Sequence, residues 1–322
     1  MYAAMLAPVL LLVGFVPLLF GAHWLVEGAS SLAARLNVPR LVIGLTIVAF
    51  GTSAPELVVN LVASVEGRPA LVLSNVIGSN VLNILLILGV AALFRDLAVQ
   101  SSTTWSEIPL ALLSALVVLV LANDGVLEGR SFSEVSRIDG LVLLGFFLVF
   151  MAYTVNLLLR GGAEEDPPLK LYSIGRSFLM IIGGLLLLML GADLIVDSAV
   201  TVATRLGVSE RLIGLTIVSA GTSLPELVTS IVAARKGNSD LAIGNVVGSN
   251  LFNAFFILGA SAVVAPVPLV PGANLDLLVN LGASSLLFLF VFTGSGRHID
   301  RREGLAFLVL YAIYLAVLIG VR

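Results

Sequence analysis

The sequence has no cysteine, little charge and only two histidines. The absence of cysteine excludes disulfides and thiolate chemistry. Charged residues make up 11% of the 322 residues, whereas a soluble domain typically carries about 25%. The net charge is −3 and no basic tail or basic–aromatic pattern is present, so we expect no nucleic acid partner.

Long apolar runs fill the chain instead. Hydrophobic residues account for 59% of the sequence, and the mean hydropathy is +1.11. Many runs approach 20 residues, the length at which a helix crosses a bilayer core about 30 Å thick. They are continuous, whereas the strands of a membrane β-barrel are shorter and alternate. We therefore predict an all-α integral membrane protein whose environment is the lipid bilayer.

Ten transmembrane helices are predicted from these runs. The first has no basic residue before it, so we interpret it as a retained span and not as a cleaved signal peptide. The Pro167–Pro168 pair and the charges around it mark a linker over 161–173. The predicted spans are 6–27, 40–65, 70–94, 107–122, 138–160, 174–200, 211–236, 240–264, 274–293 and 303–320.

An internal repeat relates the two sides of this linker. GTSAPELV at Gly51 returns as GTSLPELV at Gly221, and NVIGSNVLN (75–83) returns as NVVGSNLFN (245–253). Between 44–89 and 214–259, aligned without a gap at an offset of 170, we count 25 identities in 46 positions. We therefore predict two five-helix repeats, 1–160 with its motif at 44–89 and 174–322 with its motif at 214–259.

Because five is odd, the two repeats must be inverted relative to each other across the membrane. Inverted repeats with a site near the midplane are typical of secondary transporters. Of the 17 Lys and Arg residues, most lie in the loops after the odd-numbered spans, which predicts that this side is cytoplasmic and that both termini are extracellular or periplasmic. The remaining six lie on the other side: Arg68, Arg130, Arg137, Arg205, Arg211 and Arg322.

The repeated octet interrupts a membrane helix and supplies oxygen atoms. Pro55 and Pro225 lack an N–H and loosen the carbonyls about one turn before them, which then need another partner in hydrocarbon. Glu56 and Glu226 lie mid-span, where a carboxylate is costly and functional by default. A single Pro kink in a membrane helix is usually structural. Two carboxylates at equivalent positions, each beside a helix-breaking proline, favour an ion-binding site instead.

All the donors in this pattern are hard oxygens, which suit Ca²⁺, Mg²⁺ and Na⁺. Two bidentate glutamates, Glu56 and Glu226, together with the carbonyls of Thr52 and Thr222, offer about six oxygens and two negative charges for one Ca²⁺. Smaller monovalent sites are expected at the hydroxyls of Ser53, Ser79, Ser223 and Ser249.

These motifs resemble the two α-repeats of the cation/Ca²⁺ exchanger superfamily, and within it the prokaryotic sodium/calcium exchangers. The resemblance implies the sodium/calcium exchanger fold and Na⁺-driven Ca²⁺ antiport by alternating access, with three Na⁺ per Ca²⁺. It implies backbone ligands at Ala49 and Ser219 and a middle site at Asn83 and Asn253. It also implies that spans 1 and 6 slide over the core, with Gly21 and Gly191 as close-packing points.

One departure leaves the coupling ion open. Relatives often carry Asp at the position of Asn83 or Asn253, so this site has two carboxylates and not three. An H⁺/Ca²⁺ antiporter is therefore the alternative, although the first motif of the proton-coupled branch is absent.

Two other functional classes are disfavoured. A cation channel would typically need oligomeric symmetry around a pore, whereas these two halves build one site, so we expect a functional monomer. An enzyme would need a nucleophile–base pair or a metal dyad, and no His or Asp lies mid-span to supply one. We expect no enzymatic activity and no cofactor, with Ca²⁺ and Na⁺ as transported ions, in a prokaryotic inner membrane.

Overall fold

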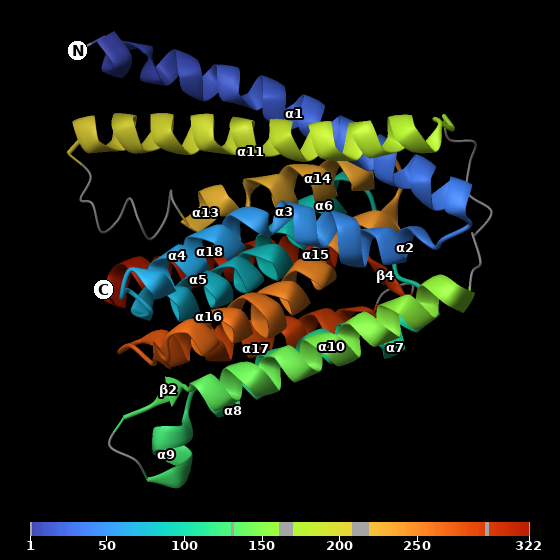
Figure 1. Cartoon of the computed structure of the whole chain (residues 1–322). Coiled ribbons are helices and arrows are strands. Elements are labelled where there is room, and N and C mark those ends of the chain that lie inside the picture. Colours follow the sequence, from blue (N-terminus) through green and yellow to red (C-terminus); the bar gives the residue numbers. More distant parts are fainter. Residues whose placement is uncertain (1, 130–131, 161–169, 208–218, 294–295, 322) are drawn as a thin grey trace.

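The computed structural model describes residues 2–129, 132–160, 170–207, 219–293 and 296–321. Helices form almost all of it (Figure 1). The elements before the linker are α1 (Tyr2–Leu36), α2 (Arg40–Ile43), η1 (Gly44–Val48), α3 (Ala49–Thr52), α4 (Ala54–Val65), α5 (Ala70–Val81), η2 (Leu82–Leu88), α6 (Gly89–Phe94), β1 (Leu97–Ala98), α7 (Ser101–Trp105), α8 (Glu107–Leu121), α9 (Asp124–Glu128), β2 (Glu134–Val135) and α10 (Arg137–Arg160).

The elements after the linker follow a similar order. They are α11 (Ile174–Arg205), α13 (Ser219–Thr222), α14 (Leu224–Arg235), α15 (Ser239–Leu251), η4 (Phe252–Ile257), α16 (Leu258–Val264), β3 (Val267–Pro268), α17 (Ala273–Phe290), β4 (His298–Ile299) and α18 (Arg301–Val321). The predicted linker lies largely on 161–169, outside the described residues.

Seven helices in the described part of the chain are long and apolar enough to cross a membrane. An eighth span results if the bent pair Arg40–Thr52 and Ala54–Val65, which meet at 47°, counts as one. The predicted span 303–320 coincides with α18, and the first part of the predicted span 211–236 lies on 208–218, outside the described residues. The protein is therefore a multi-pass membrane protein.

The first helix is longer than predicted, because it continues from residue 27 to Leu36. Its polar residues find partners on other elements, so they do not end it. Glu27 pairs with Lys236 at 2.8 Å, and Ser30 Oγ accepts a hydrogen bond from Asn238 Nδ2 at 2.9 Å. Hydropathy alone placed the end where polarity rises, but these tertiary contacts extend the helix.

The long helices α1 and α11 lie side by side along one face of the molecule (Figure 1). Glycines bring their backbones together. A Cβ atom at Gly21 would lie 2.7 Å from the carbonyl oxygen of Gly184, and one at Gly191 would lie 2.8 Å from that of Gly14. The close packing predicted at Gly21 and Gly191 is confirmed, since only glycine permits such an approach.

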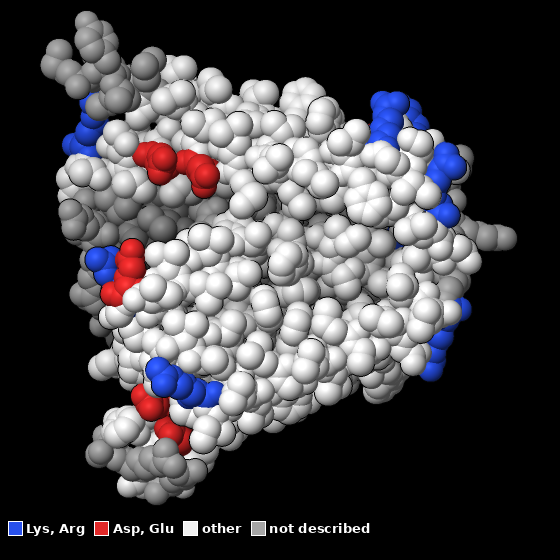
Figure 2. Space-filling view, in the orientation of Figure 1, with Lys and Arg blue, Asp and Glu red and all other residues white. Residues whose placement is uncertain are grey.

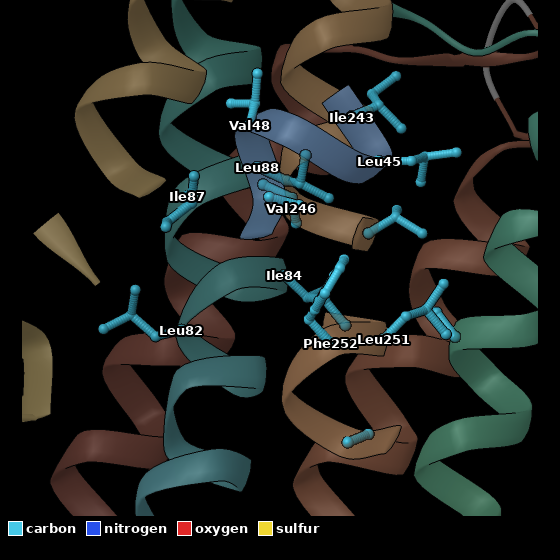
Figure 3. Close-up of a cluster of buried hydrophobic side chains, with 14 of the residues drawn as sticks. Leu45, Val48, Leu82, Ile84, Ile87, Leu88, Ile243, Val246, Leu251 and Phe252 are labelled. Atoms are coloured by element: carbon cyan, nitrogen blue, oxygen red, sulfur yellow. The ribbon is translucent and has the colours of Figure 1, made fainter. Parts of the chain in front are cut away.

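The core lies beneath these two helices and joins the two halves of the chain. Side chains from η1, η2, α15 and η4 interdigitate there (Figure 3). Leu45, Ile84, Leu88 and Val246 are fully buried. The outer faces of the long helices are apolar and exposed, as in Leu148 of α10, and Figure 2 shows Lys, Arg, Asp and Glu gathered toward the two ends of the molecule.

Contacts between the halves recur at an offset near 170 residues. Strand β1 pairs with β4 and β2 pairs with β3, both antiparallel, so each short strand pairs with one from the other half. In the same way, α18 packs on α6 while α10 packs on α16. The two halves therefore pack against each other through equivalent strands and helices.

Candidate ion-binding site

Two broken helices carry the predicted carboxylates into the core. The helix breaks at Ser53 (φ −84°, ψ 6°) between α3 and α4, and at Ser223 (φ −93°, ψ 8°) between α13 and α14. Pro55 and Pro225 occupy the first turn after each break, where the missing N–H has no helical partner to lose. Glu56 and Glu226 lie in the same first turns.

Each glutamate is held by a serine from the opposite half. Ser53 Oγ donates to Glu226 Oε1 at 2.9 Å, and Ser223 Oγ donates to Glu56 Oε1 at 3.0 Å. Both carboxylates are 1% exposed. The breaks in the two helices therefore meet, and the two octets form one site.

The second oxygen of each carboxylate has no hydrogen-bond partner. Glu56 Oε2 and Glu226 Oε2 are buried and unpaired, as are Asn83 Oδ1, Asn253 Oδ1 and Ser249 Oγ. An unpaired polar group inside a membrane protein costs free energy, since no lipid group can replace the bond. The two carboxylate and two amide oxygens are acceptors only, so the arrangement fits a bound cation and does not fit an anion.

Four asparagines explain why amide oxygens are left free. Asn83 Nδ2 donates to Asn250 Oδ1 at 2.9 Å, and Asn253 Nδ2 donates to Asn80 Oδ1 at 3.0 Å. Asn80 and Asn250 in turn donate to each other's backbone oxygens at 3.2 and 3.4 Å. The NH₂ groups of Asn83 and Asn253 are used in this network, which leaves their oxygens for a ligand.

Asn80 and Asn250 were missed as site residues from the sequence. They stand in the repeated GSN strings at the same offset of 170, so the signal was present. Asn83 and Asn253 lie in the wide-turned helical segments η2 and η4, which occupy equivalent places in the two halves. Such π-turns are frequent at functional sites.

The remaining predicted ligands also lie around the breaks. Ser79 Oγ lies 3.3 Å from Ser223 Oγ, and Thr52 Oγ1 donates to Asn245 Oδ1 at 3.1 Å. The carbonyl oxygen of Ala49 already accepts from Ser53 N at 3.0 Å and from Thr52 Oγ1 at 3.3 Å. A cation at Ala49 would therefore have to displace or share one of these bonds.

The second copies of these ligands are described in part. Thr222 ends α13 and Ser219 begins it, so both stand where the offset of 170 places them. The side chain of Ser219 lies outside the described residues. In the described part of the chain, no group of three or more His, Cys, Asp or Glu gathers around one point. The site therefore has two carboxylates and neutral oxygens, which suits alkali and alkaline-earth cations.

The chain matches a family model described as sodium/calcium exchanger protein over residues 6–156 and 176–320. It is 38% identical to a putative antiporter CaxA of Alkalimonas amylolytica, covering 96% of this chain and 98% of that protein. It is 37% identical to the inner membrane protein YrbG of Escherichia coli K12, covering 83% and 82%. It is 31% identical to the sodium/calcium exchanger MaX1 of Methanosarcina acetivorans, covering 96% and 97%.

A solved structure has the same fold. The sodium-calcium exchanger NCX_Mj, soaked with 10 mM Na⁺ and zero Ca²⁺, superposes with a TM-score of 0.83 at 33% identity, covering 97% of this chain and 99% of that one. A crystal of NCX_Mj soaked with 100 mM Na⁺ and 10 mM Sr²⁺ matches with the same TM-score. This chain belongs to the sodium/calcium exchanger family of membrane transporters.

Proposed function

We propose that this antiporter exchanges Na⁺ for Ca²⁺ and that Glu56 and Glu226 bind the ions. The observation that supports it most directly is the pair of buried carboxylates whose second oxygens, Glu56 Oε2 and Glu226 Oε2, have no partner. The relatives MaX1 and NCX_Mj are named as sodium/calcium exchangers, which favours the same ions here.

One Ca²⁺ is assigned to the two carboxylates. Their two negative charges match its charge, and each has an unpaired oxygen for it. The backbone oxygens of Thr52 and Thr222 stand beside the breaks and complete the shell in this proposal.

The Na⁺ sites are assigned to the neutral oxygens around the same carboxylates. Ser249 Oγ and the amide oxygens of Asn83 and Asn253 are unpaired and buried, so they are available without the loss of an existing bond. The full set of proposed Na⁺ ligands is Ser53, Ser79, Ser223, Ser249, Asn83, Asn253 and the carbonyls of Ala49 and Ser219.

We assign ten spans in two inverted repeats, 1–160 and 174–322, joined by the linker 161–173. The exchange of strands between halves and the equivalent packing of α10 and α18 support this assignment. In Figure 1 both termini lie at the same end of the molecule, and on the face seen in Figure 2 the charged residues visible at the opposite end are Lys and Arg. We take that opposite end as cytoplasmic.

Alternating access is assigned to a movement of α1 and α11 over the core. These helices touch each other through glycines and expose large apolar faces outward, and the side-chain bonds of α1 to the α14–α15 turn, at Glu27 and Ser30, lie toward one end of the helix. Since both carboxylates come from one chain, a monomer contains the whole site.

Exchange in proteoliposomes tests the proposal. Vesicles loaded with Na⁺ should take up Ca²⁺ when diluted into Na⁺-free buffer at equal pH inside and outside. A pH gradient without a Na⁺ gradient should not drive uptake. Uptake driven by the pH gradient alone would establish the proton-coupled alternative, and uptake that ignores Na⁺ on the opposite side would indicate a channel.

A further inference from the structure

We propose that a basic pocket at the end of the molecule that carries β1 and β4 binds the phosphate headgroup of an anionic phospholipid. The pocket has a volume of about 760 Å³ and is open to the surface. It lies apart from the ion site, and nothing in the exchange of Na⁺ and Ca²⁺ requires it.

Three segments from both halves build the pocket. They are the end of α6 with β1, the turn between α14 and α15, and β4 with the start of α18. The pairing of Leu97 with Ile299 and of Ala98 with His298 holds two of them together, and Val99 N extends the ladder with a 2.8 Å bond to Arg297 O. The pocket wall is therefore fixed by backbone hydrogen bonds.

The charge of the pocket is positive. Arg95, Arg301 and Arg302 line it, together with Asp96 and Asp300. Asp300 Oδ1 is used by the N-terminal turn of α18, where it accepts from the backbone N–H of Arg302 at 2.7 Å. Among the described residues, no ion pair engages Arg95 or Arg301. These two guanidinium groups are free for an anion.

Glycine at position 237 makes room for Arg95. Gly237 has a φ of +80°, and a Cβ atom there would lie 2.8 Å from Arg95 Nη1. The guanidinium therefore lies against the backbone of the α14–α15 turn, in the same pocket that the start of α18 lines. Its fork of N–H donors suits the oxygens of a phosphate group.

The duplicated fold offers an internal control for this interpretation. The equivalent corner around β2 and β3 has Ala265 in place of Arg95 and Glu134 in place of His298. It keeps two arginines: Arg68, in the turn equivalent to 237–239, and Arg137, which donates to the backbone oxygen of Val264 at 3.4 Å. That corner forms the same strand pair without a counterpart of Arg95, so Arg95 is not required by the fold.

The surroundings favour a lipid over a free phosphate. Phe94 lines the pocket and is 51% exposed, and Leu305 and Val309 of α18 are exposed on the helix that starts at its rim. Helices α6 and α18 cross closely at Gly89 and Gly304, so their outward faces form one apolar surface. A headgroup in the pocket would place its acyl chains over this surface, as basic pockets beside membrane helices do for anionic lipids.

Native mass spectrometry of the full chain tests the proposal. The purified protein is titrated with phosphatidylglycerol or phosphatidylcholine, and the affinity of the tightest site is measured. We expect the Arg95→Gln/Arg301→Gln variant to bind phosphatidylglycerol about 30-fold more weakly, on the basis of two lost charges near the membrane surface. Arg68→Gln, at the other end of the molecule, is the matched control and should bind as the wild type does.

Two further measurements distinguish loss of the lipid site from misfolding and a lipid ligand from a soluble phosphate. The Arg95→Lys/Arg301→Lys variant keeps the charge and should stay within about tenfold of the wild type, which guards against loss by misfolding. Unchanged phosphatidylglycerol binding in the glutamine variant would overturn the proposal. Equal occupancy by inorganic phosphate or by glycerophosphoglycerol would show that a soluble phosphate, not a lipid, is the ligand. Since the readout is lipid binding, it does not depend on which ions are exchanged.

Discussion

Replacing Glu56 with Gln is predicted to weaken Ca²⁺ binding by two to three and a half orders of magnitude. The change keeps the shape of the side chain and removes one of the two negative charges that face the ion. The carboxylate is 1% exposed and its Oε2 atom has no hydrogen-bond partner, so bulk water cannot replace the lost charge. Breaking a buried charge pair costs about 3–5 kcal/mol, and about 1.4 kcal/mol corresponds to a tenfold change in affinity.

Isothermal titration of the detergent-solubilised protein with Ca²⁺ measures this effect. Glu226→Gln should cause a loss of similar size, because the two residues occupy equivalent positions and are each held by one serine. Glu107→Gln is the matched control, since Glu107 is a fully buried glutamate bonded to Tyr153 and lies outside the site. A dissociation constant within threefold of the wild type in either site variant would refute the assignment of the carboxylates.

Three further predictions follow from contacts around and beyond the site. Ser53→Ala removes a hydrogen bond to the facing carboxylate, worth about 1.5–3 kcal/mol, and should lower the Tm of the ion-free protein; an unchanged Tm would contradict a stabilising role for this bond. Gly21→Ala forces a Cβ atom to 2.7 Å from a carbonyl oxygen of α11 and should slow Ca²⁺ flux while Ca²⁺ affinity is preserved; Gly145→Ala, which meets nothing within 4 Å, should leave flux unchanged. The pKa of Asp300 is lowered below its ordinary 3.8, chiefly by a hydrogen bond from the backbone N–H of Glu303 in the first turn of α18. The ionised Asp300 therefore stabilises the fold above pH 3.8, and this stabilisation is lost as the pH falls through the lowered pKa. The Tm difference between the wild type and Asp300→Ala should accordingly be constant above about pH 5 and close in stronger acid.

The local features of the site could be predicted from the sequence because they are encoded in short strings. Proline in the first turn after Ser53 and Ser223 marks both helix breaks, and the offset of 170 pairs the two copies. The repeat also predicted that Glu56 and Glu226 share one site, and their serine bonds across the halves agree with it.

Contacts between distant segments could not be predicted in the same way. The crossed amide bonds of Asn80 and Asn250 depend on the way two helices from opposite halves meet, which no short string contains. The end of α1 was misplaced because Glu27 is polar and its partner, Lys236, is 209 residues away. The basic pocket combines 94–98, 237–239 and 298–302, which only the folded chain brings together.

Ca²⁺ uptake under swapped gradients tests the central claim most directly. Wild-type proteoliposomes are loaded with Na⁺ or with acidic buffer, and ⁴⁵Ca²⁺ uptake is compared after dilution into Na⁺-free or alkaline buffer. Exchange of Na⁺ for Ca²⁺ at Glu56 and Glu226 predicts rapid uptake with the Na⁺ gradient, none with the pH gradient, and loss of uptake in Glu56→Gln. Uptake that follows the pH gradient, or that persists in Glu56→Gln, would contradict it.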